Sequence, residues 1–451
     1  MPQLSDNPTP KLLRRLNTFD LTMIVIGSII GAGIFMTPSS IAQVLPSPAL
    51  IIFVWSLGGI MALCGALTYA ELGAMIPEAG GVYVYLTKAY GGLWGFLYGW
   101  AYFLVVNTGG LAAIALVYAS YLGYFVHLSA VGVKLAAILG IVLLTGVNYF
   151  GVKIGGAFAG IFTILKVIAI AGLIVFGFVL GKPDSTPFLP LIPSHLGNGL
   201  RDSLALGMVG VLWAYGGWQH ATFLAGEAKD PKRSLPVSII TGTLVVIVAY
   251  VLVNLVYLYL LPVPQIASTT RVAADAAGRF LGPTGATLIS LSIFISTFGT
   301  AGIYTLSAPR IYYAMAEDGV FFKKTAYVHP KYHTPTFSII FQSVWVIVLL
   351  LSGNFLQLIT YAIFADWIFF ALTAASVFVF RRRMPEAERP YKTLGYPYTT
   401  LFFVLVASWF VVNTLITAPI QSFAGLAFIS LGIPVYYYWK RKKVLPGATD
   451  A

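Results

Sequence analysis

The chain has a single cysteine and very few charged residues. Only 9% of its 451 residues are Asp, Glu, Lys or Arg, whereas a soluble domain carries about 25%. Hydrophobic residues make up 58%, which is the composition of an integral membrane protein. Cys64 lies within an apolar run, so neither an internal disulfide nor a thiolate metal cluster can form. We interpret Cys64 as a small buried hydrophobe.

Motifs of catalysis, metal binding and nucleic-acid recognition are also missing. The five histidines are scattered, without a His-Glu-x-x-His or Gly-x-Ser-x-Gly pattern. His329 and His333 have ligand spacing, but nearby prolines indicate a loop and no third ligand is close in sequence. We therefore expect no metal, no cofactor and no enzymatic activity. The basic residues are dispersed among short loops, so we expect no nucleic-acid partner.

Apolar stretches long enough to cross a bilayer fill most of the chain from Leu21 to Trp439. A spanning helix needs about 20 residues, and hydropathy predicts twelve spans. They cover residues 21–45, 49–76, 93–126, 131–150, 154–180, 203–224, 237–261, 285–315, 336–352, 355–380, 398–418 and 420–439. No long polar linker divides them, which indicates one integral membrane domain.

Positive charge is concentrated on one side of the predicted spans. Lys11, Arg14 and Arg15, then Arg381–Arg383 and Lys440–Lys443, flank spans on the side of both termini. Lys and Arg are enriched in cytoplasmic loops of membrane proteins. We therefore expect cytoplasmic termini and a location in the cell inner (plasma) membrane, and the net charge of +12 follows from these loops.

Two predicted spans are interrupted by glycines. The first contains Gly27, Gly31 and Gly33, and the sixth contains the adjacent Gly216 and Gly217. Glycine interruptions at corresponding places in two halves indicate the binding site of an inverted-repeat transporter. Unwound backbone must line a cavity or meet a polar substrate, because lipid cannot satisfy it. The alternative is close helix packing through small residues.

An amino acid carries the two charges that suit such breaks. Its carboxylate is attracted to the N-terminal end of a half-helix, here at Gly31, Ala32 and Gly33, and its ammonium to carbonyls at C-terminal ends. The pair of breaks therefore predicts transport of amino acids by alternating access.

The glycine runs and the loops beside them resemble a known superfamily. Segments 27–35, 69–72 and 77–83 look like the first helix and first cytoplasmic loop of the amino acid–polyamine–organocation superfamily. Segments 213–218 and 226–236 are similar to the L-type amino acid transporter branch and its bacterial relatives. The likeness extends from about Leu16 to Lys443.

This resemblance implies an all-α membrane protein with twelve transmembrane helices. Two inverted five-helix repeats with broken helices 1 and 6 would be followed by two peripheral helices. On this basis we divide the chain into a cytoplasmic N-terminal segment (1–20), a first repeat (21–180), a second repeat (181–380), helices 11 and 12 (381–439) and a basic cytoplasmic tail (440–451).

The resemblance also implies site residues. By position, the substrate carboxylate would meet the backbone of Ala32 and Gly33, and the ammonium the carbonyls of Ile29, Trp213 and Gly216. Trp213 occupies the position of the aromatic gate of the family. Ala32 stands where many members have serine, so only a backbone contact is expected there.

Lys166 lies deep in the fifth predicted span. It is about a dozen residues, hence ~18 Å, from the end of that span, where a lysine costs roughly 2.5–3.5 kcal/mol and calls for a partner. Ser296 and Thr300 are four apart and share one helix face, and the resemblance places them where sodium-coupled relatives hold an ion. The lysine ammonium would replace sodium, as a fixed cation or as a proton-coupling group; the alternative is a snorkelling lysine.

Asp366 is an acid inside the tenth predicted span. It is a proton carrier, a contact for a cationic substrate or a satisfied carboxylate of the bundle, and the sequence leaves these alternatives open.

Together these features predict sodium-independent transport of L-amino acids, neutral ones in preference, by an exchanger or proton-coupled symporter. The alternative substrates are cationic amino acids or polyamines. A channel is disfavoured, because a filter motif and an Arg-rich voltage helix are missing, and so is a membrane enzyme. The segment around 127–130 has no cysteine, so we expect no disulfide-linked heavy chain; the expected partners are the amino acid substrate and membrane lipid.

Overall fold

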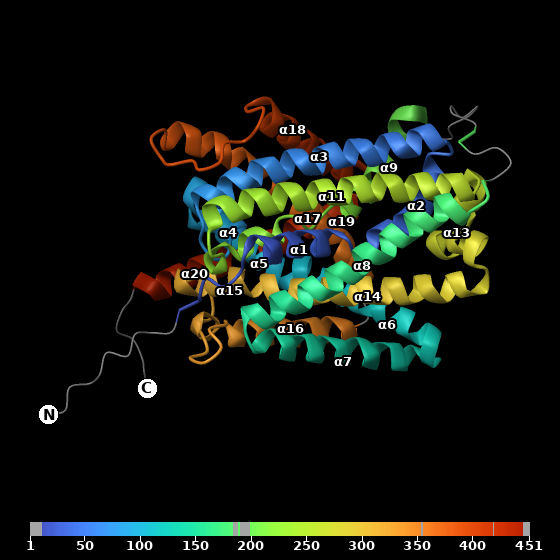
Figure 1. Ribbon diagram of the computed structural model, residues 1–451. Helices are drawn as coiled ribbons and strands as arrows, with labels where there is room; N and C mark the ends of the chain where they lie inside the picture. The colour runs from blue at the N-terminus through green and yellow to red at the C-terminus, as the bar shows by residue number, and fades with distance from the viewer. Residues whose placement is uncertain (1–10, 184–187, 190–198, 353–354, 418, 445–451) are drawn as a thin grey trace.

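The computed structural model is a bundle of long helices (Figure 1). It describes residues 11–183, 188–189, 199–352, 355–417 and 419–444. Within these residues the only β-pairing is one isolated bridge between Leu16 and Ala228. The predicted all-α membrane fold is confirmed.

Ten helical stretches among the described residues are long and apolar enough to cross a membrane. They cover residues 18–44, 48–75, 92–126, 130–149, 152–180, 231–260, 283–317, 364–383, 398–417 and 419–442. A shorter apolar helix is α16 (Thr336–Ser352). The remaining predicted span, 203–224, corresponds to α9 (Gly199–Ala214) and α10 (His220–Phe223), which are separated by the second break.

The helices have the following bounds. The first half contains α1 (Thr18–Ile29), α2 (Gly33–Val44), α3 (Pro48–Met75), α4 (Val82–Tyr90), α5 (Gly92–Ala101), the π-helical turn η1 (Tyr102–Val106), α6 (Asn107–Val126), α7 (Ala130–Tyr149) and α8 (Val152–Leu180). After α9, α10 and the short η2 (Ala225–Glu227) come α11 (Pro231–Leu260), α12 (Val263–Ser268), α13 (Val272–Leu281), α14 (Pro283–Ser307), α15 (Pro309–Glu317) and η3 (Lys323–Ala326). The chain ends with α16, α17 (Phe355–Arg383), α18 (Tyr398–Thr417), α19 (Pro419–Ser430) and α20 (Gly432–Val444).

Local sequence explains where several helices begin. The Asn17 side chain accepts from the Asp20 amide while Asp20 accepts from the Asn17 amide, a capping box that starts α1. Pro48, Pro231 and Pro283 each stand in the first turn of a helix, where the missing N–H has no cost. These capping residues set the observed helix starts, which differ from the starts predicted by hydropathy mostly by a few residues.

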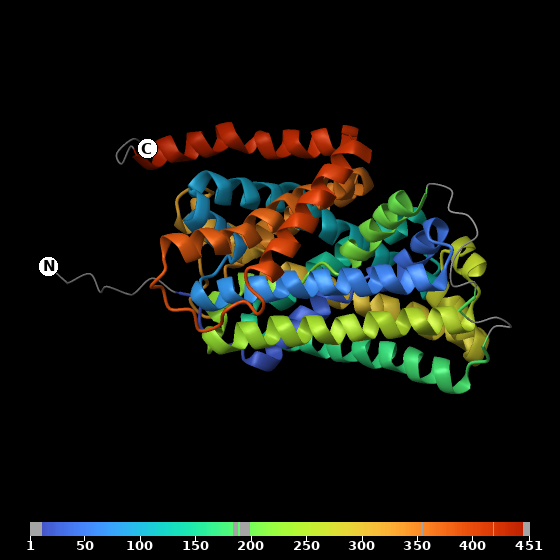
Figure 2. The same cartoon turned by 90° about the horizontal axis from the view of Figure 1, so that it is seen from above.

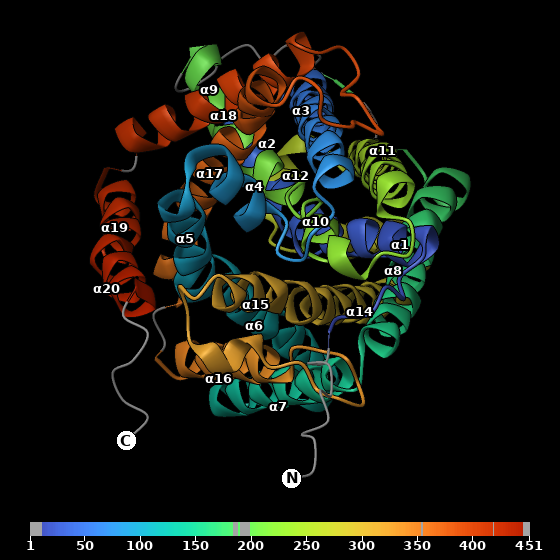
Figure 3. The same ribbon diagram turned by 90° about the vertical axis from the view of Figure 1, so that its left-hand side faces the viewer.

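The two broken helices lie at the centre of the bundle. α1 packs against α11, α8 and α14, and α14 packs in turn against α6 and α8. The end-on view shows α10 near the middle of the ring of helices, with α19 and α20 on the outside (Figure 3). Seen from above, the C-terminal helices, in red, likewise lie at the edge of the bundle (Figure 2). The core that surrounds the breaks is therefore built by both halves of the chain.

The described chain begins and ends at the same end of the bundle. α1 starts and α20 finishes at the left of Figure 1. Both termini on one side are what an even number of spans gives. Residues 1–10 and 445–451 of the predicted terminal segments lie outside the described residues, and the proposed division into two repeats stays a prediction.

Candidate substrate site

The first break is the non-helical stretch between α1 and α2. α1 ends at Ile29 and α2 begins at Gly33, with Ile30 in an extended conformation (φ −73°, ψ 90°). Among the described residues the backbone N–H groups of Gly31, Ala32 and Gly33 have no hydrogen-bond partner. They lie at the N-terminus of a 12-residue helix, where the helix dipole attracts an anion. This geometry suits a carboxylate.

The second break joins α9 to α10 and lies directly against the first. Gly217 has φ +126°, and a Cβ atom there would lie 2.6 Å from the carbonyl oxygen of Ser28. The Ser28 hydroxyl is 2.9 Å from the Gly217 carbonyl oxygen. Only glycine accommodates both this φ and this approach.

Close packing explains one glycine of the first break as well. A Cβ atom at Gly33 would lie 2.8 Å from the Cα atom of Ala214 at the end of α9. Gly31 is more open, because the nearest atom to such a Cβ is 3.7 Å away on Thr300. Close packing therefore explains Gly33 and Gly217, whereas Gly31 has room beside it, as expected of backbone that lines a binding site.

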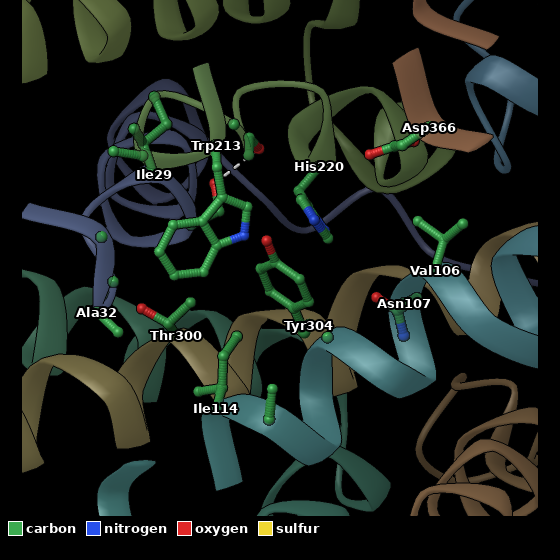
Figure 4. Close-up of a pocket in the computed structure, with 18 of the residues that line it drawn as sticks. Ile29, Ala32, Val106, Asn107, Ile114, Trp213, His220, Thr300, Tyr304 and Asp366 are labelled. Atoms are coloured by element: carbon green, nitrogen blue, oxygen red, sulfur yellow. Dashed lines mark hydrogen bonds between the residues drawn. The ribbon is translucent and has the colours of Figure 1, made fainter. Parts of the chain in front are cut away.

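A cavity of about 510 Å³ opens beside the two breaks (Figure 4). It extends along α6 to Ser120 and Tyr121, away from the end that carries the chain termini. All the predicted substrate contacts line it: Ile29, Gly31, Ala32, Gly33, Trp213 and Gly216. Thr300 and Asp366 line it too, whereas Lys166 and Ser296 lie behind its wall.

The Trp213 side chain projects into this cavity. Its indole is 38% exposed, and Figure 4 shows it between Ile29 and Ala32 of the first break and the ring of Tyr304. A permanently buried core tryptophan would be covered on all sides. The position fits a side chain that can fold over a bound molecule.

Two of the carbonyls predicted to meet the ammonium already accept one hydrogen bond each. The Tyr250 hydroxyl donates to the Ile29 carbonyl at 3.0 Å, and the Gly216 N–H donates to the Trp213 carbonyl at 3.2 Å. A carbonyl oxygen has two lone pairs, so each can accept a second donor. The bonds found here fix the direction in which these carbonyls face.

Lys166 is buried between α1, α8 and α14. Its Nζ lies 2.9 Å from the Gly27 carbonyl oxygen and 2.8 Å from that of Ile30. On α14 it lies 3.0 Å from the Ser296 carbonyl oxygen and 2.9 Å from Thr300 Oγ1. Lys166 is only 1% exposed, so it does not snorkel. Its three N–H donors are fully used, and Ser296 contributes its backbone and not its hydroxyl.

Sequence reasoning missed His220, which borders the cavity. Its Nδ1 is 2.6 Å from Ser307 Oγ and its ring centroid is 4.2 Å from that of Tyr304. His220 is 0% exposed although it borders the cavity. The available signal was its place in a predicted span, three residues after a glycine pair.

A buried ion pair and two backbone hydrogen bonds join separate segments at the end of the bundle that carries the termini. Arg310 Nε and Nη2 donate to the Glu227 carboxylate at 2.6 and 3.0 Å, and both side chains are 0% exposed. The N–H groups of Arg15 and Leu16 donate to the Glu227 carbonyl oxygen at 2.8 and 2.9 Å. These contacts tie the segment after α10 to α15 and to the segment before α1.

The comparisons with known proteins agree with this geometry. Residues 16–436 match the amino acid permease family. The chain belongs to this family. The permease is 34% identical over 434 residues to the serine/threonine exchanger SteT of Bacillus subtilis, covering 94% of this chain and 96% of that protein.

Two mammalian relatives extend the comparison. The permease is 29% identical to the b(0,+)-type amino acid transporter 1 of Rattus norvegicus, covering 96% of this chain and 91% of that protein. It is 30% identical to the large neutral amino acids transporter small subunit 2 of Mus musculus, covering 93% of this chain and 80% of that protein. The predicted superfamily is confirmed, and the chain is a multi-pass membrane transporter of amino acids and not an enzyme.

Proposed function

We propose that this permease carries neutral L-amino acids across the cytoplasmic membrane by alternating access and without sodium, as an exchanger or proton-coupled symporter. The substrate carboxylate binds the free N–H groups of Gly31, Ala32 and Gly33, and its ammonium binds the carbonyls of Ile29, Trp213 and Gly216. The observation that carries the proposal is the ammonium of Lys166, which four oxygens hold beside the first break.

This ammonium occupies the place that a coupling sodium ion needs. Carbonyl and hydroxyl oxygens are ligands for hard cations, and the oxygens of Gly27, Ile30 and Thr300 already surround Nζ. A sodium ion between α1 and α14 would meet a fixed positive charge at close range. Transport therefore does not depend on sodium.

Replacing sodium by choline is expected to leave uptake unchanged. The measurement is initial uptake of labelled L-serine, L-alanine and L-leucine by proteoliposomes that contain the purified permease. A steep dependence on sodium for the transported substrates would contradict the role given to Lys166.

Neutral substrates are expected to bind more tightly than cationic ones. Asp366 is the only Asp, Glu, Lys or Arg among the described residues that line the cavity, and Lys166 lies behind the same wall. The Lys166 ammonium repels a second positive charge, and a cationic side chain would also have to give up water on entering the cavity. The names of two relatives, a serine/threonine exchanger and a large neutral amino acids transporter subunit, favour the same class.

A competition panel against labelled substrate measures this preference. Alanine, serine or leucine should displace the label at lower concentration than arginine or lysine. The reverse order would make Asp366 a ligand for the substrate side chain, and the permease a carrier of cationic amino acids or polyamines.

We also propose that the termini face the cytoplasm and that the single chain suffices for transport. The basic clusters beside the spans at the terminal end support this orientation. The connection between α6 and α7 contains no cysteine, so a disulfide-linked heavy chain cannot be attached there.

A further inference from the structure

Three acids of the described chain lie inside the helix bundle, and two of them are held by arginine. Glu71 accepts from Arg381 Nε and Nη2 at 2.9 and 2.8 Å, and Glu227 accepts from Arg310 at 2.6 and 3.0 Å. Charge-assisted, two-pronged bonds of this kind stabilise the ionised carboxylate. Each of these two acids therefore has a fixed cationic partner.

Asp366 differs from both. It lies on α17 and lines the cavity, half-buried. Its Oδ1 is buried without a hydrogen-bond partner, and no described lysine, arginine or histidine forms an ion pair with it. A charged carboxylate without a donor in a poorly solvated site is unfavourable, and one proton removes that charge.

The side chains that face Asp366 supply no permanent counter-charge. α17 packs against α3, α4, α5, η1, α6, α16, α18 and α19. Of these, α5, η1, α6, α16, α18 and α19 contain no acid, lysine, arginine or histidine. Glu71 of α3 is paired with Arg381, and Lys88 of α4 is paired with Glu78. The titratable neighbours within electrostatic reach are tyrosines: Tyr69, Tyr98, Tyr102 and Tyr304.

Lys166 and His220, the other two ionisable side chains described beside the cavity, both have hydrogen-bond partners. Lys166 Nζ is saturated by four oxygens and does not line the cavity. His220 is 0% exposed, and its Nδ1 is bonded to Ser307. Figure 4 shows the Asp366 carboxyl at the edge of the space that holds the Trp213 indole.

We propose that Asp366 is the binding site of a coupling proton, so that the permease moves one proton with each neutral amino acid. The inference rests on the proposed function and decides between its two modes in favour of symport. The carboxylate takes a proton from the side to which the cavity is open. The cavity then closes around the bound amino acid while the Asp366 carboxyl is neutral. The proton leaves from the same carboxyl when the cavity opens on the other side.

Calorimetric proton counting tests the inference with the purified full chain. L-serine, L-alanine and L-leucine are each titrated, at several pH values, in buffers of different ionisation enthalpy. The parent should take up about one proton per bound amino acid over the pH range in which Asp366 titrates, and Asp366→Asn should take up none. Glu386→Gln removes an exposed acid far from the cavity wall and should keep the parental count.

Flux measurements give the second readout. An inside-alkaline pH gradient should drive accumulation of labelled amino acid by the parent and by Glu386→Gln, and should drive none by Asp366→Asn. If the parent binds amino acid without a linked proton, or if Asp366→Asn keeps the linked proton, the inference is wrong.

Misfolding of one variant would not leave the question open. If Asp366→Asn does not fold, Asp366→Glu replaces it, and the midpoint of the pH dependence must shift, because the carboxyl has moved by one methylene; an unchanged midpoint overturns the inference. Uptake of neutral amino acids without proton movement defeats only the inference. A parent that neither binds nor transports a neutral amino acid defeats the proposed function with it.

Discussion

Trp213→Ala is expected to lower transport about 100-fold or more while the protein still folds. Closure can bury only the exposed 38% of Trp213, on the order of 60–95 Å² of the roughly 150–250 Å² that an aromatic side chain buries. The substrate loses a similar area, so at about 25 cal/mol per Å² the closed state gains about 3–5 kcal/mol. A hundredfold effect requires about 2.8 kcal/mol. The loss falls on closure, because the backbone groups that bind carboxylate and ammonium remain. Uptake by proteoliposomes measures the loss of transport, and binding to the purified chain measures the affinity that remains.

Trp213→Phe is the matched control. A smaller aromatic ring covers part of the same area, so partial activity is expected. Transport by Trp213→Ala at the parental rate would show that Trp213 is not the gate. If Trp213→Ala instead melts at a much lower temperature, the partly exposed indole has a structural role. Transport by Trp213→Phe then shows whether closure is affected as well.

Lys166→Met is expected to lower substrate affinity about 100-fold or more. The substitution keeps most of the length of the side chain but removes its three donors. The Thr300 hydroxyl, which also lies 3.0 Å from the carbonyl oxygens of Gly27, Ile30 and Ser296, has one hydrogen to share among them, and each buried acceptor that loses its donor costs about 1–3 kcal/mol. The Gly27 and Ile30 carbonyls belong to the end of α1, so the shape of the first break changes with them. Equilibrium binding of labelled amino acid to the folded fraction measures the effect.

Thr300 supplies the control for this prediction. Thr300→Ser keeps the hydroxyl that accepts from Lys166 at 2.9 Å and should behave like the parent, whereas Thr300→Val should show a smaller loss than Lys166→Met. A variant Lys166→Met with normal affinity but reduced thermal stability would mean that the lysine only supports the fold.

Contacts at the terminal end of the bundle must change if the cavity is to open on that side. The Arg310 and Glu227 pair joins α15 to the segment after α10, and the N–H groups of Arg15 and Leu16 bind the same segment. Opening at that end must separate groups that are now fully buried, so substrate must stabilise the alternative state by at least as much. The segments that carry these links lie directly before α1 and directly after α10, so they are placed to couple substrate binding at the breaks to opening at this end.

The sequence by itself determined the spans, the two breaks and the depth of Lys166. Each of these is a local property: hydropathy over about 20 residues predicts a span, adjacent glycines such as Gly216 and Gly217 weaken a helix where they stand, and counting along α8 gives the height of a side chain. The residues that line the cavity from both breaks followed from these local signals and from the resemblance to a family.

Only the tertiary structure decided which polar groups have partners and which do not. Arg381 meets Glu71 from 310 positions along the chain and Arg310 meets Glu227 from 83, and His220 joins the cavity wall because α10 faces α14. The free Oδ1 of Asp366 is visible only when every neighbouring helix is in place. Hydrogen bonds and ion pairs act over a few ångströms, so chain positions that are remote in sequence acquire them only through packing.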